Sequence, residues 1–132
     1  MQFKECYQNP FIEERADPYI TLGPDGFYYF TASYPMKSAD DKDGYDRVIL
    51  RRAKDISELA SAEEITIWKV ADTTLTHRFI WAPELHYIAG LWYVFYAGSE
   101  DKENNWAFDC HVLVCDSNDP YTGTWSEKGK FQ

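Results

Sequence analysis

With 132 residues, 45% of them hydrophobic, the chain is long enough for one domain with a real core and too apolar to be disordered. Its formal net charge of −9 would repel a polyanion, which excludes nucleic acid and anionic membranes as partners. Aromatic residues make up 17% of the chain and favour strands over helices, because flat rings pack well on a pleated surface. Aromatic rings also suit sugar binding, and composition leaves both interpretations open.

Neither the cysteines nor the chain start identifies a site. The three cysteines are an odd number, and Cys110 and Cys115 would leave opposite faces of one expected strand, so they are not expected to form a bridge. No apolar signal segment is visible at the start, and the longest apolar run, near 91–97, is only as long as a strand. If Met1 is the native start, we expect a cytoplasmic protein; otherwise the compartment is undetermined.

Taken in chain order, the first half predicts four strands. An apolar strand, a glycine-containing turn at 23–26 and an aromatic strand form a β-hairpin. A half-buried strand with alternating polarity follows, then a region at 55–64 that allows one helical turn capped by Asp55 or Ser57, and a short closing strand. The four strands are expected at 16–22, 27–32, 47–53 and 65–68.

The second half repeats this order. The aromatic strands of the two halves align at an offset of 64 residues, from Tyr28 to Trp92, and 47–53 aligns with 110–116. The strands of this half are expected at 82–88, 91–97, 110–116 and 124–127. Two sets of four antiparallel strands predict an all-β fold made of β-propeller blades, with blade one at about 14–70 and blade two at about 80–130.

Two blades cannot close a ring, because propellers typically have about four to eight. A two-blade piece would leave apolar sheet faces uncovered. We therefore expect residues 1–132 to be a partial propeller domain that needs further blades of the same protein, or another chain.

Five short motifs then make the interpretation specific. They are Asn9-Pro10, Ala16-Asp17-Pro18-Tyr19-Ile20, Asp25-Gly26-Phe27-Tyr28-Tyr29-Phe30, Leu50-Arg51-Arg52-Ala53-Lys54-Asp55-Ile56 and Trp81-Ala82-Pro83-Glu84-Leu85-His86. Together they resemble the N-terminal part of glycoside hydrolase family 43, over nearly the whole chain. The resemblance implies a five-bladed propeller, of which roughly the first two blades are present.

The resemblance also implies a function. It is hydrolysis, with inversion, of α-L-arabinofuranosyl or β-xylosyl linkages in arabinan, arabinoxylan or xylo-oligosaccharides. No cofactor is implied, although a full propeller has room for a structural calcium ion. The sequence does not choose between arabinose and xylose. A different class remains open, a carbohydrate-binding or scaffold propeller without catalysis.

The chemistry needs two carboxyl groups, one to activate water and one to protonate the leaving oxygen, roughly 6.5–9.5 Å apart in an inverting enzyme. By resemblance Asp17 is the general base. It opens an inner strand, where strand starts converge on the central funnel, and Pro18 is expected to hold it in an extended conformation. The alternative is a turn or cap aspartate before proline.

Glu84 opens the inner strand of the second blade. By resemblance it is the third carboxylate of the family, which raises the pKa of the general acid and orients it. Many members carry aspartate here, and a solvated glutamate is the alternative. The family's acid is a glutamate in the third blade, beyond this chain, so residues 1–132 alone are expected to be inactive.

Three further side chains are substrate-binding candidates: Tyr34, Trp81 and His86. Tyr34 follows the second strand and Trp81 precedes Glu84, while His86 shares a strand face with Glu84 by period two. Core or rim packing is the alternative for each. No metal site is expected: His77 and His111 lack partners, and Glu100, Asp101 and Glu103 suit a solvated loop better than a calcium site.

Overall fold

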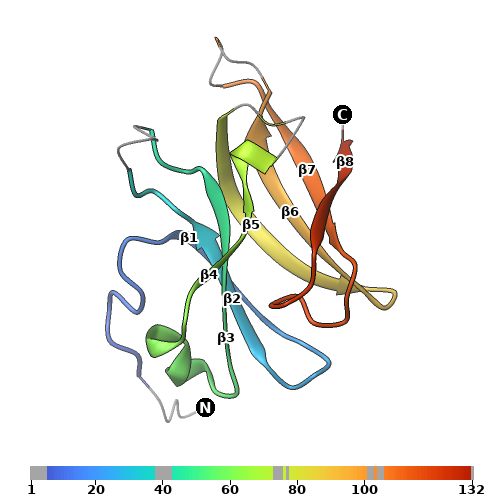
Figure 1. Cartoon of the computed structure of the whole chain (residues 1–132). Helices are drawn as coiled ribbons and strands as arrows, with labels where there is room; N and C mark the ends of the chain where they lie inside the picture. The colour runs from blue at the N-terminus through green and yellow to red at the C-terminus, as the bar shows by residue number, and fades with distance from the viewer. Residues whose placement is uncertain are drawn as a thin grey trace.

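The structure, a computed structural model, describes residues 6–37, 43–72, 76, 78–100, 103 and 106–131. It contains two antiparallel sheets of four strands each, with strand orders β1-β2-β3-β4 and β5-β6-β7-β8 (Figure 1). Sheet one consists of β1 (Ala16–Leu22), β2 (Tyr28–Ser33), β3 (Arg47–Ala53) and β4 (Ile65–Lys69). Sheet two consists of β5 (Arg78–Ile88), β6 (Leu91–Ser99), β7 (Phe108–Cys115) and β8 (Trp125–Phe131). The expected all-β fold of two blades is confirmed.

Two short 3-10 helices, η1 (Ile56–Ser61) and η2 (Val70–Asp72), follow β3 and β4. The expected helical turn is η1, and Asp55 caps it by accepting the backbone N–H of Ser57 at 2.8 Å. Within the described part of the chain, no helix has the length and apolar character needed to cross a membrane.

Both inner strands, β1 and β5, carry the same irregularity. Each ladder slips at a bulge, and each bulge contains a residue in the left-handed region followed by proline, Asp17 with φ 50° and Ala82 with φ 47°. Directly past the bulge, β2 contributes Thr31 and β6 contributes Phe95 to the pairing. These two residues are 64 positions apart, so the predicted offset of the second strands is confirmed.

The third strands are offset differently from the prediction. Tyr29 pairs with Arg52 in sheet one, and its counterpart Tyr93 pairs with Val114 in sheet two. The third strands therefore correspond at an offset of 62, whereas alignment of 47–53 with 110–116 implied 63. The loops between the second and third strands differ in length, and only the backbone pairing shows where the equivalent strand begins.

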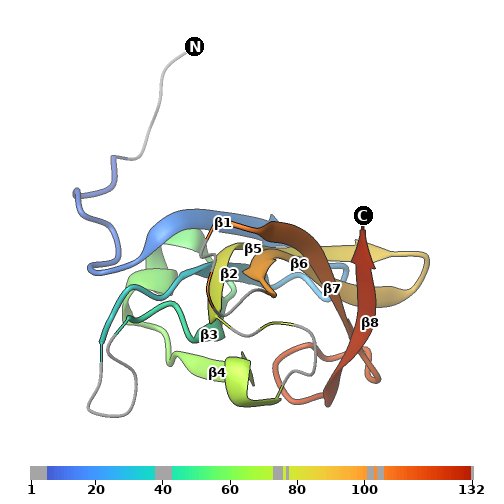
Figure 2. The ribbon, with the colours of Figure 1, turned by 90° about the horizontal axis from the view of Figure 1, so that it is seen from above.

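The two sheets pack face to face through one large core. Tyr29 of sheet one meets Trp92 of sheet two, with ring centroids 5.1 Å apart. This core cluster consists of Tyr29, Val48, Leu50, Trp68, Ile80, Leu85, Trp92, Val94, Tyr96, Leu113, Cys115 and Trp125. The inner strands β1 and β5 lie side by side, as Figures 1 and 2 show.

The opposite face of sheet one is covered by the chain itself. A second core cluster lies there, made of Phe30, Ala32, Ile49, Ala53 and Leu59. Leu59 comes from η1, and Phe11 and Ile12 of the segment before β1 pack against the cluster. Sheet one is therefore buried on both faces.

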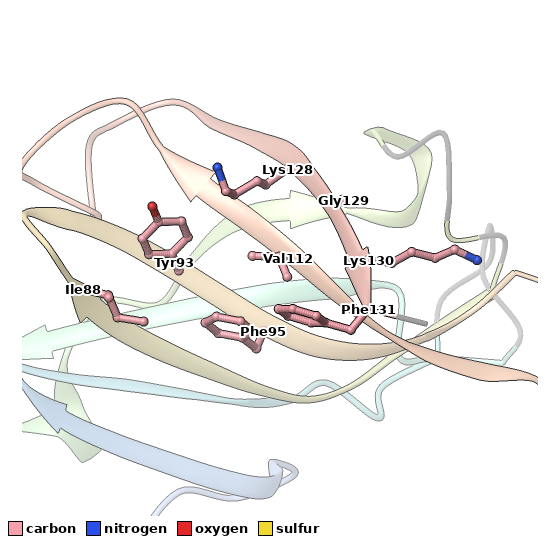
Figure 3. A pocket seen from close by; sticks show the side chains of 8 residues that line it. All are labelled: Ile88, Tyr93, Phe95, Val112, Lys128, Gly129, Lys130 and Phe131. Carbon is pink, nitrogen blue, oxygen red and sulfur yellow. The ribbon is translucent and has the colours of Figure 1, made fainter.

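The opposite face of sheet two is open. Apolar side chains line a cavity of about 310 Å³ on it, and Lys128 and Lys130 stand at its border (Figure 3). Phe95 and Phe131 stack across the cavity with ring centroids 6.2 Å apart, and Phe131 is 62% exposed. Strand pairing makes Phe131 the counterpart of Trp68, which is buried between the sheets. The open face of sheet two thus corresponds to the face of sheet one that another sheet covers.

Candidate active site

Asp17 lies at the bulge of β1 with an exposed side chain. Its carboxylate oxygen Oδ2 accepts a hydrogen bond from the hydroxyl of Ser33 at 3.1 Å. The same hydroxyl oxygen accepts the backbone N–H of Ala82 at 2.7 Å. Asp17 is not extended as expected from Pro18, because the bulge turns its backbone into the left-handed region.

Glu84 is the first paired residue past the bulge of β5, two positions after Ala82, so Ala82 and not Glu84 occupies the position equivalent to Asp17. The side chain of Glu84 is 52% exposed, and its Oε2 is 3.0 Å from Nε2 of His86. Because an ionised carboxylate only accepts hydrogen bonds, the imidazole N–H is the donor. The expected common strand face of Glu84 and His86 is therefore visible as a direct contact.

Tyr19 joins this pair from the neighbouring strand. Its ring centroid is 5.3 Å from that of His86. Burial and the negative charge of Glu84 raise the pKa of Tyr19, and burial and Glu84 likewise raise the pKa of Cys110. Sequence analysis missed Tyr19. The available signal was its spacing, because Tyr19 and Thr21 follow Asp17 at period two, as His86 follows Glu84.

Two arginines pack on the ring of Tyr34. The guanidinium carbons of Arg15 and Arg47 each lie 4.4 Å from its ring centroid. Two guanidinium groups therefore already pack on this ring. Sugar stacking on Tyr34 remains a prediction that gains no support from this packing.

Trp81 belongs to an aromatic cluster at the end of the molecule where β1 and β5 begin. It stacks on Phe108 at 4.2 Å and contacts Phe79, Tyr45 and Trp106 with centroid distances of 5.4, 6.0 and 6.1 Å. Trp106 is 81% exposed, whereas Trp81 is half-buried. Trp106 was missed by sequence analysis, and the available signal was a tryptophan in an otherwise polar loop.

Among the described residues, no group of three or more histidine, cysteine or acidic side chains is placed to hold a metal ion. Glu100 accepts a hydrogen bond from Lys130 at 2.6 Å, and burial lowers the pKa of His111. Asp101, part of the calcium interpretation, and His77 lie outside the described residues.

The profile of glycosyl hydrolases family 43 matches residues 7–132. The chain belongs to this family. The resemblance to this family is thereby confirmed over almost the whole chain. The partial propeller is confirmed with it, since the solved relatives of the family are β-propellers.

Individual relatives are similar to this chain in sequence and in structure. The chain is 43% identical over 125 residues to an extracellular exo-α-(1→5)-L-arabinofuranosidase of Streptomyces avermitilis, covering 95% of this chain and 24% of the relative. It is 41% identical over 126 residues to α-L-arabinofuranosidase 43 of Humicola insolens, covering 96% and 24%. The crystal structure of an α-L-arabinofuranosidase from Lactobacillus brevis superposes with a TM-score of 0.79 at 40% identity, covering 96% of this chain and 39% of that one.

The chain thus spans about a quarter of the length of these curated relatives. The expectation of a cytoplasmic protein, which depended on Met1, is wrong, because the Streptomyces relative is named as an extracellular enzyme. A methionine at the start of a sequence carries no information on compartment when the sequence covers so little of its relatives.

Proposed function

We propose that residues 1–132 form the part of an inverting α-L-arabinofuranosidase that carries the general base. The observation that carries the proposal is the exposed carboxylate of Asp17 at a bulge of an inner strand, fixed by the buried hydroxyl of Ser33. Relatives 41% and 43% identical are named α-L-arabinofuranosidases, which favours arabinose over xylose.

The reaction assigns one step to this chain. Asp17 accepts a proton from water as the water oxygen bonds to the anomeric carbon, and the bond from that carbon to the leaving oxygen breaks. A carboxylic acid in the remainder of the protein protonates the leaving oxygen. Ser33 engages Oδ2 of Asp17, and Oδ1 is the oxygen we assign to the water.

We assign Glu84 the electrostatic role that the resemblance implies. Its negative charge would raise the pKa of a nearby carboxylic acid and keep that acid protonated. His86 donates to Glu84 and holds its carboxylate at the junction of β1 and β5, where Tyr19 also lies. His86 itself is half-buried and is the group of this pair that we place nearest to a bound sugar.

For the sugar-stacking role we favour Trp106, supported by Trp81. The indole of Trp106 is exposed, and Trp81 holds it edge-on at 6.1 Å while stacking on Phe108. Because neighbouring rings already restrain the indole of Trp106, little conformational entropy is lost when a sugar ring packs on it.

The test is a panel of nitrophenyl glycosides and debranched arabinan with the full-length protein, with proton NMR of the first-formed sugar. We expect release of arabinose from α-L-arabinofuranosides with inverted anomeric configuration. Activity on β-xylosides alone would overturn the substrate, and a retained anomer would overturn the role of Asp17 as base. Absence of hydrolysis with sugar binding preserved would favour the non-catalytic propeller.

A further inference from the structure

A serine at the end of β2 links the two bulges of the inner strands. Ser33 is completely buried, at 0% exposure. Its oxygen receives the N–H of Ala82 on β5 at 2.7 Å, and its hydroxyl lies 3.1 Å from Oδ2 of Asp17 on β1. One side chain therefore connects residues of three strands and both sheets.

The donors and acceptors of this bridge determine the direction of its hydrogen bonds. A serine hydroxyl has one proton to donate, and a backbone N–H can only donate. Since the Ser33 oxygen accepts from Ala82, its own proton is free to be donated to Oδ2 of Asp17. The bridge thus fixes Oδ2 of Asp17 and leaves Oδ1 as the oxygen assigned to the water.

The bridge also acts on strained backbone. Asp17 and Ala82 both adopt positive φ, a conformation that is unfavourable for a non-glycine residue. Such conformations persist only where surrounding contacts hold them. Ser33 contacts both, so its loss would free both bulges together.

Comparison within the chain separates this serine from an ordinary buried hydroxyl. Thr31, on the same strand, is 1% exposed, and its hydroxyl has no hydrogen-bond partner among the described residues. In sheet two the counterpart of Ser33 is Ala97, paired with Trp81 beside the bulge that holds Ala82. The hydroxyl and the carboxylate are thus both present in sheet one and both absent from sheet two.

We propose that Ser33 is a positioning residue for the general base, setting the rotamer of Asp17 relative to both sheets. This inference rests on the proposed function of Asp17. Misplacement of a reacting group by about 1 Å can cost about 100-fold in rate, so the effect belongs in kcat. Substrate binding, made by other side chains, should change little.

The experiment uses the full-length protein with an aryl α-L-arabinofuranoside, at a temperature well below every variant's unfolding transition. The variants are Ser33→Ala, Asp17→Ala, their double variant and Thr31→Val as the matched control. We expect Ser33→Ala to lower kcat by about 10- to 100-fold with KM changed by less than about twofold. Thr31→Val, which removes a buried hydroxyl without a hydrogen-bond partner among the described residues, should keep normal kcat.

The double variant distinguishes positioning from general damage. If Ser33 acts through Asp17, the double variant should be no slower than Asp17→Ala alone, because residues that act as a unit are not additive. Fully additive losses, or normal kcat in Ser33→Ala, would overturn the inference while leaving the base in place. Normal kcat in Asp17→Ala would instead overturn the proposed function. Should Ser33→Ala not fold, Ser33→Cys, a weaker donor of similar size, carries the same two outcomes.

Discussion

The two sheets of this chain have the same backbone plan and different chemistry. Each inner strand bulges at one residue in the left-handed region followed by proline, but the residue is Asp17 in sheet one and Ala82 in sheet two. The neighbouring position across the ladder is Ser33 in one and Ala97 in the other. The repeat supplies the strained position, and the side chain placed on it decides whether that position can do chemistry.

The sheets differ again in how their outer faces are covered. Sheet one is covered on both faces, by sheet two on one and by η1 and the segment before β1 on the other. Sheet two instead exposes Phe131 beside a cavity, on the face that corresponds to the one it covers in sheet one. An apolar face of this kind is stable in a soluble protein only when something covers it. In a propeller the next blade has this role, so the asymmetry follows from the partial ring.

The largest expected effect tests the difference between the bulges. In the full-length protein, Asp17→Ala removes the side chain that we propose as general base. A positioned general base typically contributes about 10²–10⁴-fold in rate, so kcat should fall by about that factor. Steady-state kinetics on an aryl arabinofuranoside measures it. Glu13→Ala, which removes an exposed carboxylate four residues away, is the control and should keep normal kcat. A normal rate in Asp17→Ala would mean that the two bulges do not differ in function.

The next prediction compares Trp68 and Phe131, which lie on equivalent faces of sheet one and sheet two. In the full-length protein, Trp68→Ala and Phe131→Ala should each destabilise by about 3–5 kcal/mol, since a next blade would bury Phe131 as sheet two buries Trp68. Urea unfolding gives both values. A cost below about 0.5 kcal/mol for Phe131→Ala, beside a large cost for Trp68→Ala, would show that the face of sheet two stays open.

A smaller effect should make the stability of sheet one depend on pH. Glu64 accepts hydrogen bonds from Arg15 and Arg51 at 3.1 and 2.9 Å. Burial alone would raise the pKa of Glu64, but these two guanidinium groups outweigh it and lower the pKa below its ordinary value. A depressed pKa stabilises the fold above the unfolded-state pKa, and this stabilisation is lost as pH falls through the folded-state pKa.

Glu64→Gln should therefore cost about 1–3 kcal/mol at pH 7, as expected for hydrogen bonds to charged groups. The difference in unfolding free energy between wild type and Glu64→Gln should narrow as the pH falls below about 4. Thermal unfolding over a pH series measures it, with Glu58→Gln, an exposed glutamate of η1, as the control. A gap that does not change with pH would contradict the charge-based explanation.

The smallest effect concerns the hairpin turns. The loop between β5 and β6 has two residues, Ala89 and Gly90, with φ of 50° and 86°, the pattern of a type I′ turn. Asparagine tolerates the left-handed region better than alanine, so Ala89→Asn should stabilise by about 0.5–1 kcal/mol. Calorimetry should show a rise in Tm, and a fall in Tm would contradict the turn assignment.

Much of the fold could be predicted because its determinants are local. Alternating polarity, glycine-containing turns and aromatic strands indicate β-hairpins without knowledge of what covers them, and the repeat of that pattern places two blades. The predicted ends of the strands were less accurate. The fifth strand begins at Arg78 rather than 82, and the eighth ends at Phe131 rather than 127. Strand ends depend on the pairing partner, which the sequence pattern does not contain.

The sequence by itself therefore determined the strands, the blade repeat, the family motifs and the candidate base. Only the tertiary structure decided how that base is held. Ser33 meets the backbone of Ala82 across 49 positions of the chain, and Tyr34 contacts both Arg15 and Arg47. The physical reason is that periodicity reports on which side of a strand a residue lies, whereas the partner of a side chain depends on which distant strand packs beside it.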